Sequence, residues 1–68
     1  MDFNLGDRIK KLEDLREGDG YFIDNELHQL VLKEENRYVF QTMLGTYVAN
    51  KAMMEQHMRA GIFTLKIS

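Results

Sequence analysis

The chain has 68 residues, which limits it to one small domain covering residues 1–68. It contains no cysteine, which excludes disulfides and thiolate metal sites, and its formal net charge of −2 argues against a densely basic nucleic-acid-binding module. Apolar residues make up 44% of the chain and charged residues 29%, as is typical of folded globular proteins. No apolar run approaches the ~18 residues that span a bilayer, and the N-terminus lacks the apolar region of a signal peptide. We therefore expect a cytoplasmic protein without a membrane segment.

Residues 1–19 form a lead-in whose structure the sequence leaves open. Asp7 is a suitable N-cap, and three apolar residues around it lie at helical spacing. These residues are Leu5, Ile9 and Leu12. A helix within residues 5–17 fits this pattern, and so does an irregular segment with a single helical turn.

Residues 14–20 (DLREGDG) interrupt regular structure and lead into an aromatic strand that begins at Tyr21. Leu15 ahead of Gly18-Asp19, followed by such a strand, resembles the entry to small SH3-like β-barrels, including small phage-encoded ones. The resemblance implies a partly closed barrel. It also implies an accessory protein of a phage or mobile element, such as an inhibitor of a host enzyme. A simple glycine turn into a strand accounts for the same residues.

Two hairpins are predicted between residues 21 and 44, where apolar and polar residues alternate. Asp24-Asn25 favours a type I′ turn that places Phe22 opposite Leu27. A loop of three residues, Glu34-Glu35-Asn36, is predicted to join strands 27–33 and 37–44, with Asn36 in the left-handed conformation.

This second loop sets the predicted register. It pairs Leu30 with Phe40 and Leu32 with Tyr38, so these four residues are expected to form the core face of the sheet. The opposite face is mixed, because Gln29 and Gln41 interrupt its apolar residues. These apolar residues are Phe22, Leu27, Val31, Val39 and Met43.

The last third of the chain predicts a short strand at 46–49, a helix at 51–60 and a terminal strand at 62–67. Asn50 is the expected N-cap of the helix, and Gly61 is expected to end it. The predicted fold class is mostly β (α+β): a small antiparallel, SH3-like, partly closed barrel of about five short strands, with one helix before the last strand. An open α+β sheet with the helix on one face is the alternative.

The sequence predicts no catalytic, cofactor or metal site. A nucleophile would require cysteine or serine, and the only serine is the last residue, Ser68. The two histidines, His28 and His57, are not spaced as a pair of ligands on one helical face. We therefore expect that the protein is not an enzyme.

The predicted helix carries three methionines within six positions, a composition found at adaptable protein contacts. Together with the mixed face, it gives a candidate partner surface made of Phe22, Leu27, Met43, Met53 and His57. We predict a non-catalytic binding protein that engages another protein, with a homodimer as one form of this association. The alternative is a small β-barrel nucleic-acid-binding protein in which Tyr47 and Phe22 stack on bases.

Overall fold

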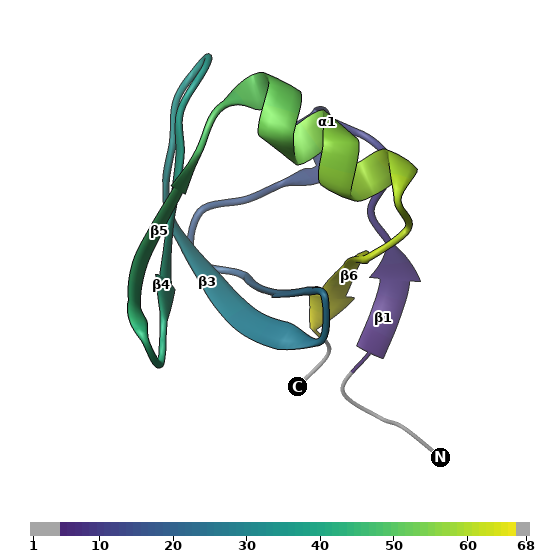
Figure 1. The fold of residues 1–68 in the computed structure, drawn as a ribbon, viewed down its shortest axis with the longest axis horizontal. Coiled ribbons are helices and arrows are strands. Elements are labelled where there is room, and N and C mark those ends of the chain that lie inside the picture. The colour runs from purple at the N-terminus through teal and green to yellow at the C-terminus, as the bar shows by residue number, and fades with distance from the viewer. Residues whose placement is uncertain (1–4, 67–68) are drawn as a thin grey trace.

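The computed structural model describes residues 5–66, which form a mostly β fold with one α-helix (Figure 1). Its elements are β1 (Leu5–Arg8), a 3₁₀ turn η1 (Leu12–Asp14), β2 (Gly20–Ile23), β3 (Glu26–Lys33), β4 (Tyr38–Thr42), β5 (Gly45–Ala49), α1 (Lys51–Arg59) and β6 (Phe63–Lys66). The strands form one antiparallel sheet in the order β1-β6-β2-β3-β4-β5. Within residues 5–66, β1 and β5 stand at the two edges and do not pair, so the sheet is open.

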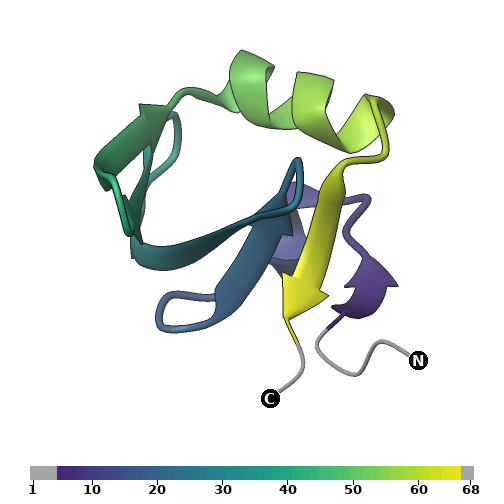
Figure 2. The ribbon, with the colours of Figure 1, turned by 60° about the horizontal axis from the view of Figure 1, so that its bottom comes forward.

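The sheet curls, and α1 lies across its concave side between β5 and β6 (Figures 1 and 2). We call this side the inner face and the opposite side the outer face. The core fills the space between the inner face and α1. Its buried apolar residues are Ile9, Leu15, Tyr21, Ile23, Leu30, Tyr38, Phe40, Ala49, Met54, Met58 and Phe63. The predicted mostly β composition, the five strands from residue 20 onward and the helix before the last strand are all confirmed.

The hairpin of β2 and β3 has the predicted turn and register. Asp24 and Asn25 have positive φ values of 52° and 68°, as a type I′ turn requires. Phe22 lies opposite Leu27, and Tyr21 lies opposite His28. Strand alternation therefore places Tyr21 in the core and Phe22 on the outer face.

The hairpin of β3 and β4 departs from its predicted register at a β-bulge. Leu30 pairs with Phe40 as expected, but beyond the bulge Leu32 pairs with Val39 and Lys33 with Tyr38. The extra residue at the bulge moves Leu32 to the outer face and Lys33 to the inner face. The prediction of Leu32 in the core face was therefore wrong.

The predicted three-residue loop was also wrong, because the register beyond the bulge changes the pairing of the residues next to the loop. The Glu34 N–H donates to the Arg37 carbonyl at 2.8 Å, so a shorter turn joins β3 and β4. Asn36 is not in the left-handed conformation. Its Oδ1 atom instead accepts a hydrogen bond from the Lys51 N–H at 3.0 Å, which ties this turn to the start of α1.

The described part of the lead-in, residues 5–19, contains the single helical turn of its second predicted alternative, but it also contains strand β1, which neither alternative predicted. The helix expected after Asp7 is not formed, because residues 5–8 are β1, and only Leu12–Asp14 is helical. The segment between η1 and β2 hydrogen-bonds to β3, so β3 has backbone partners past the N-terminal end of β2. The Gly18 N–H donates to the Leu30 carbonyl at 2.7 Å, and the Leu30 N–H donates to the Asp19 carbonyl at 3.0 Å.

Strand β4 ends earlier than predicted, at Thr42, because Met43-Leu44 forms a tight turn into β5. Thr42 stabilises this turn through its hydroxyl, which accepts from the Leu44 N–H and donates to the Gly45 carbonyl. Gly45 has a φ of +131°, a conformation that side chains disfavour. No glycine or asparagine occupies the two central positions, so the turn lacks its usual sequence signal.

Helix α1 begins at Lys51 as the sequence predicts and ends at Arg59, one residue before the predicted end. Asn50 caps it, since its Oδ1 atom accepts from the Met53 N–H at 2.9 Å. Gly61 follows the C-terminal end with a φ of +75°. Met54 and Met58 face the core. Among residues 5–66, no helix is both long and apolar enough to cross a lipid bilayer.

Candidate binding surfaces

The outer face of the sheet exposes large aliphatic side chains. Leu27, Val31 and Val48 are 43%, 48% and 51% exposed, and α1 lies on the opposite side of the sheet. Strand alternation and the observed pairing give the apolar members of this face. They are Phe22, Leu27, Val31, Leu32, Val39 and Val48. The outer face is thus an accessible apolar surface of the described sheet.

Two apolar groups divide this face. Phe22 and Leu27 lie directly opposite each other on β2 and β3, and the valines with Leu32 form the second group. Gln29 and Gln41 pair with each other between the two groups. A shallow depression of about 370 Å³ adjoins Leu27. Its lining residues are Gly18, Asp19, Gly20, Leu27, Gln29 and Lys66.

The structure brings together only part of the partner surface predicted from the sequence. Phe22 and Leu27 are neighbours on the outer face. Met43 is fully exposed at the turn between β4 and β5, and Met53 is exposed on α1. His57 points from α1 toward β5 and is half-buried there. The five residues therefore belong to separate surfaces.

His57 belongs to a cluster that links α1 to the sheet. Its Nε2 atom lies 2.8 Å from the Tyr47 hydroxyl. His28 is buried beside Tyr47, with ring centroids 5.4 Å apart, and its Nδ1 atom lies 2.8 Å from the Glu26 carbonyl. A carbonyl only accepts hydrogen bonds, so Nδ1 of His28 carries a proton. The cluster thus joins three elements through polar rings at the edge of the core.

The described residues 5–66 hold no group of three or more histidines and carboxylates placed to bind a metal ion. Side-chain hydrogen bonds and ring packing account for the arrangement of His28 and His57. This arrangement makes the cluster a structural link whose charge state bears on stability.

The free energy of unfolding is expected to fall as the pH is lowered from 8 to about 5.5. Burial lowers the pKa of His57 below its usual 6.5, the nearby His28 lowers it further, and Asp24 opposes this shift. Because the unfolded chain takes up the proton first, stability is highest above pH 6.5 and declines below it. Urea unfolding across this pH range measures how the free energy of unfolding changes with pH.

The control is His57→Gln, which keeps a polar side chain but does not titrate. This variant is expected to show a weaker loss of stability between pH 7 and about 5.5 than the wild type. If His57→Gln lost as much stability as the wild type over this pH range, or if the wild type became more stable as the pH fell, His57 would not be the group responsible.

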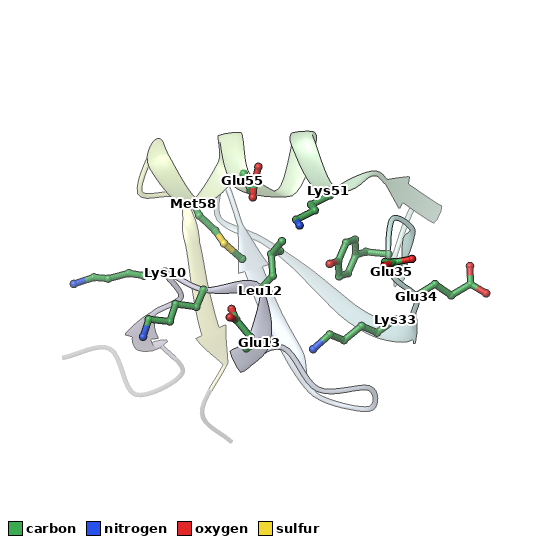
Figure 3. Close-up of a pocket in the computed structure, with 11 residues that line it drawn as sticks. Lys10, Leu12, Glu13, Lys33, Glu34, Glu35, Lys51, Glu55 and Met58 are labelled. Atoms are coloured by element: carbon green, nitrogen blue, oxygen red, sulfur yellow. The ribbon is translucent and has the colours of Figure 1, made fainter.

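A groove of about 700 Å³ lies between the lead-in, the β3–β4 turn and α1 (Figure 3). Tyr38, Leu12 and Met58 contribute apolar surface to it. Burial raises the pKa of Tyr38, and Glu55 and Glu13 add to this shift. The charged residues that line the groove are Lys10, Lys11, Lys33, Lys51, Glu13, Glu34, Glu35 and Glu55.

Sequence reasoning missed this groove because its lysines come from three distant segments. Two of its charged side chains also have partners within the protein. Lys33 Nζ donates to the Leu15 carbonyl at 2.9 Å, and Glu34 pairs with Arg37 at 2.7 Å. The equal numbers of lysines and glutamates around the groove do not favour a polyanionic ligand.

Comparisons with models of known protein families, with curated proteins and with solved structures give no match for this chain. We therefore infer the class of function from the outer face, the groove and the histidine–tyrosine cluster.

Proposed function

We propose that this chain is a non-catalytic binding protein that engages another protein through the outer face of its sheet. The exposure of Leu27, Val31 and Val48 on the side opposite α1 is the observation that supports this proposal. Groups of exposed apolar side chains on a folded domain are characteristic of sites for protein association. An antiparallel sheet that faces water on one side normally carries polar residues there, whereas β3, β4 and β5 of this sheet place Leu27, Val31, Leu32, Val39 and Val48 on that side.

The chemistry of the face defines the kind of partner that fits it. The Phe22–Leu27 pair offers apolar contact area, while Asp19, Gln29 and Lys66 supply polar groups in the depression beside Leu27. Protein interfaces typically combine such an apolar centre with a polar rim. The partner we expect presents an apolar side chain to the Phe22–Leu27 pair and hydrogen-bond acceptors to Lys66.

We also propose that the curled sheet is a variant of the small SH3-like barrel. Support comes from the segment that carries the sequence resemblance. Leu15 is buried, and Gly18 and Asp19 hydrogen-bond to Leu30 as the chain enters β2. A domain of this size with an apolar docking face suits an accessory protein of a phage or mobile element, such as an inhibitor of a host enzyme.

Nucleic acid is the alternative ligand, and the side-chain arrangement gives it less support. Tyr47, one of the two aromatic residues expected to stack on bases, is half-buried and bonded to His57. The lysines around the groove are accompanied by as many glutamates. Phosphate binding relies on clusters of lysine and arginine whose charge is not cancelled locally.

Leu27→Glu is expected to abolish partner binding while leaving the fold intact. The substitution places a carboxylate beside Phe22, where an apolar side chain of the partner would have to desolvate it. Gln56→Glu is the matched control, since it introduces the same side chain at an exposed position on α1. Both variants are compared with the wild type by affinity capture, after thermal melts have shown that they are folded. Equal capture by Leu27→Glu and the wild type would contradict the proposed docking face.

A further inference from the structure

Strand β5 presents an unprotected edge. Its sequence, GTYVA, contains no charged residue and no proline, and its side of the sheet carries no further strand within residues 5–66. Native proteins usually guard such an edge with charges, prolines or bulges. The opposite edge follows this rule, because β1 includes Asp7 and Arg8 and its pairing with β6 is irregular.

The register shows which backbone groups of β5 face the free edge. The two-residue turn makes Thr42 and Gly45 a hydrogen-bonded pair, so Tyr47 and Ala49 also bond to β4. Thr46 and Val48 alternate with them, and their N–H and C=O groups point away from β4. Thr46 and Val48 are both exposed, which leaves this edge accessible.

We propose that β5 pairs with β5 of a second copy of this chain, antiparallel and with Tyr47 on the two-fold axis. Thr46 of each copy then lies opposite Val48 of the other, and all four free backbone groups of each copy are hydrogen-bonded. The two Tyr47 residues form a pair without backbone hydrogen bonds, the type in which side chains approach most closely.

Two features favour a second copy as the occupant. The two-fold register pairs the free backbone groups of Thr46 in each copy with those of Val48 in the other, so the edge is self-complementary. The strand carries no charge, so two copies meet without placing like charges opposite each other, although each chain has a net charge of −2.

The same pairing extends the apolar outer face. Val48 on β5 and its cross-strand neighbour Val39 on β4 lie on that face. In the dimer, Val48 of each copy lies opposite Thr46 of the other on this face, so the valines of the two copies lie diagonally across the axis. Phe22 and Leu27 lie toward the other side of the sheet, on β2 and β3, and remain open to a different protein. The dimer therefore uses the β5 side of the outer face and leaves the Phe22–Leu27 group free for docking.

Sedimentation equilibrium tests the dimer directly. The wild type is expected to shift from 8.0 kDa toward twice that mass as its concentration rises. Thr46→Lys places a charge at the edge and is expected to keep the chain monomeric. Gln41→Lys adds the same charge directly opposite Thr46 on β4, one strand away from the edge, and is expected to leave the dimer intact. A wild type that stays monomeric, or equal dissociation by both variants, would overturn the proposal.

Disulfide trapping tests the register, because the chain has no cysteine of its own. Tyr47→Cys places two thiols across the axis at about 4.5 Å between Cα atoms, within the range that a disulfide spans. Val48→Cys leaves its two thiols diagonal to each other, beyond that range. Tyr47→Cys is therefore expected to form a covalent dimer under mild oxidation, and Val48→Cys is not. Efficient cross-linking of Val48→Cys with none for a folded Tyr47→Cys would overturn the proposed register.

Discussion

Phe40→Ala is expected to lower the free energy of unfolding by about 3–5 kcal/mol, the largest effect that we expect from a single substitution in this protein. Phe40 is fully buried at the centre of the inner face. Its ring centroid lies 5.8 Å from that of His28, 6.1 Å from Tyr47 and 6.3 Å from Phe63. Truncation therefore removes packing from several elements at once. Because the free energy of unfolding of a small domain is itself small, we expect the variant to be mostly unfolded at room temperature.

Gln41→Ala is the control for this substitution, since Gln41 is the next residue on β4 and is exposed on the outer face. It is expected to cost well under about 1 kcal/mol. Urea unfolding followed by circular dichroism measures both values. Similar losses for the two variants would show that the strand is displaced by one residue.

Leu15→Ala is expected to cost about 2–5 kcal/mol, although Leu15 belongs to no helix or strand. The side chain is only 2% exposed and packs in the core. The surrounding backbone is held in place by hydrogen bonds, including the one from Lys33 Nζ to the Leu15 carbonyl. The segment therefore has little freedom to close the cavity that the substitution would leave.

The matched control for Leu15→Ala is Leu32→Ala, which removes the same atoms from a half-buried leucine. We expect a loss clearly smaller than that of Leu15→Ala, because less apolar surface returns to water. Thermal melts of the two variants under one set of conditions provide the comparison. A greater loss for Leu32→Ala would support the uninterrupted register and contradict the bulge.

Local sequence signals predicted those parts of the fold that short-range chemistry determines. Asp24-Asn25 tolerates positive φ at both positions, and this property fixed the register of β2 and β3. Asn50 and Gly61 define the ends of α1 through a cap and a left-handed residue. In each case, the residues that determine the structure are close together in the chain.

Elements that depend on distant partners were not predictable from the sequence in the same way. The bulge in β3 occurs where the lead-in hydrogen-bonds to Leu30, more than ten residues away along the chain. Strand β1 forms by pairing with β6, close to the other end of the described chain. The turn at Met43-Leu44 is held by Thr42 and Gly45 and lacks the usual residues at its centre.

The same distinction applies to the candidate binding surfaces. Alternation along β2 and β3 was enough to place Phe22 and Leu27 on one exposed face. Helical periodicity left the direction of His57 undecided, and its contact with Tyr47 emerges only when α1 packs on the sheet. The mixed-charge groove requires three segments to converge, so no local pattern indicates it.

The most direct test of the proposed function is quantitative affinity capture from a nuclease-treated cell lysate, with wild type, Leu27→Glu and Gln56→Glu as parallel baits. We predict at least one protein that the wild type and Gln56→Glu retain equally and that a folded Leu27→Glu loses by about tenfold or more, the factor that corresponds to about 1.4 kcal/mol of binding free energy. Capture that is lost only when nucleic acid is digested, or that is the same for all three baits, would contradict docking of a protein on the outer face.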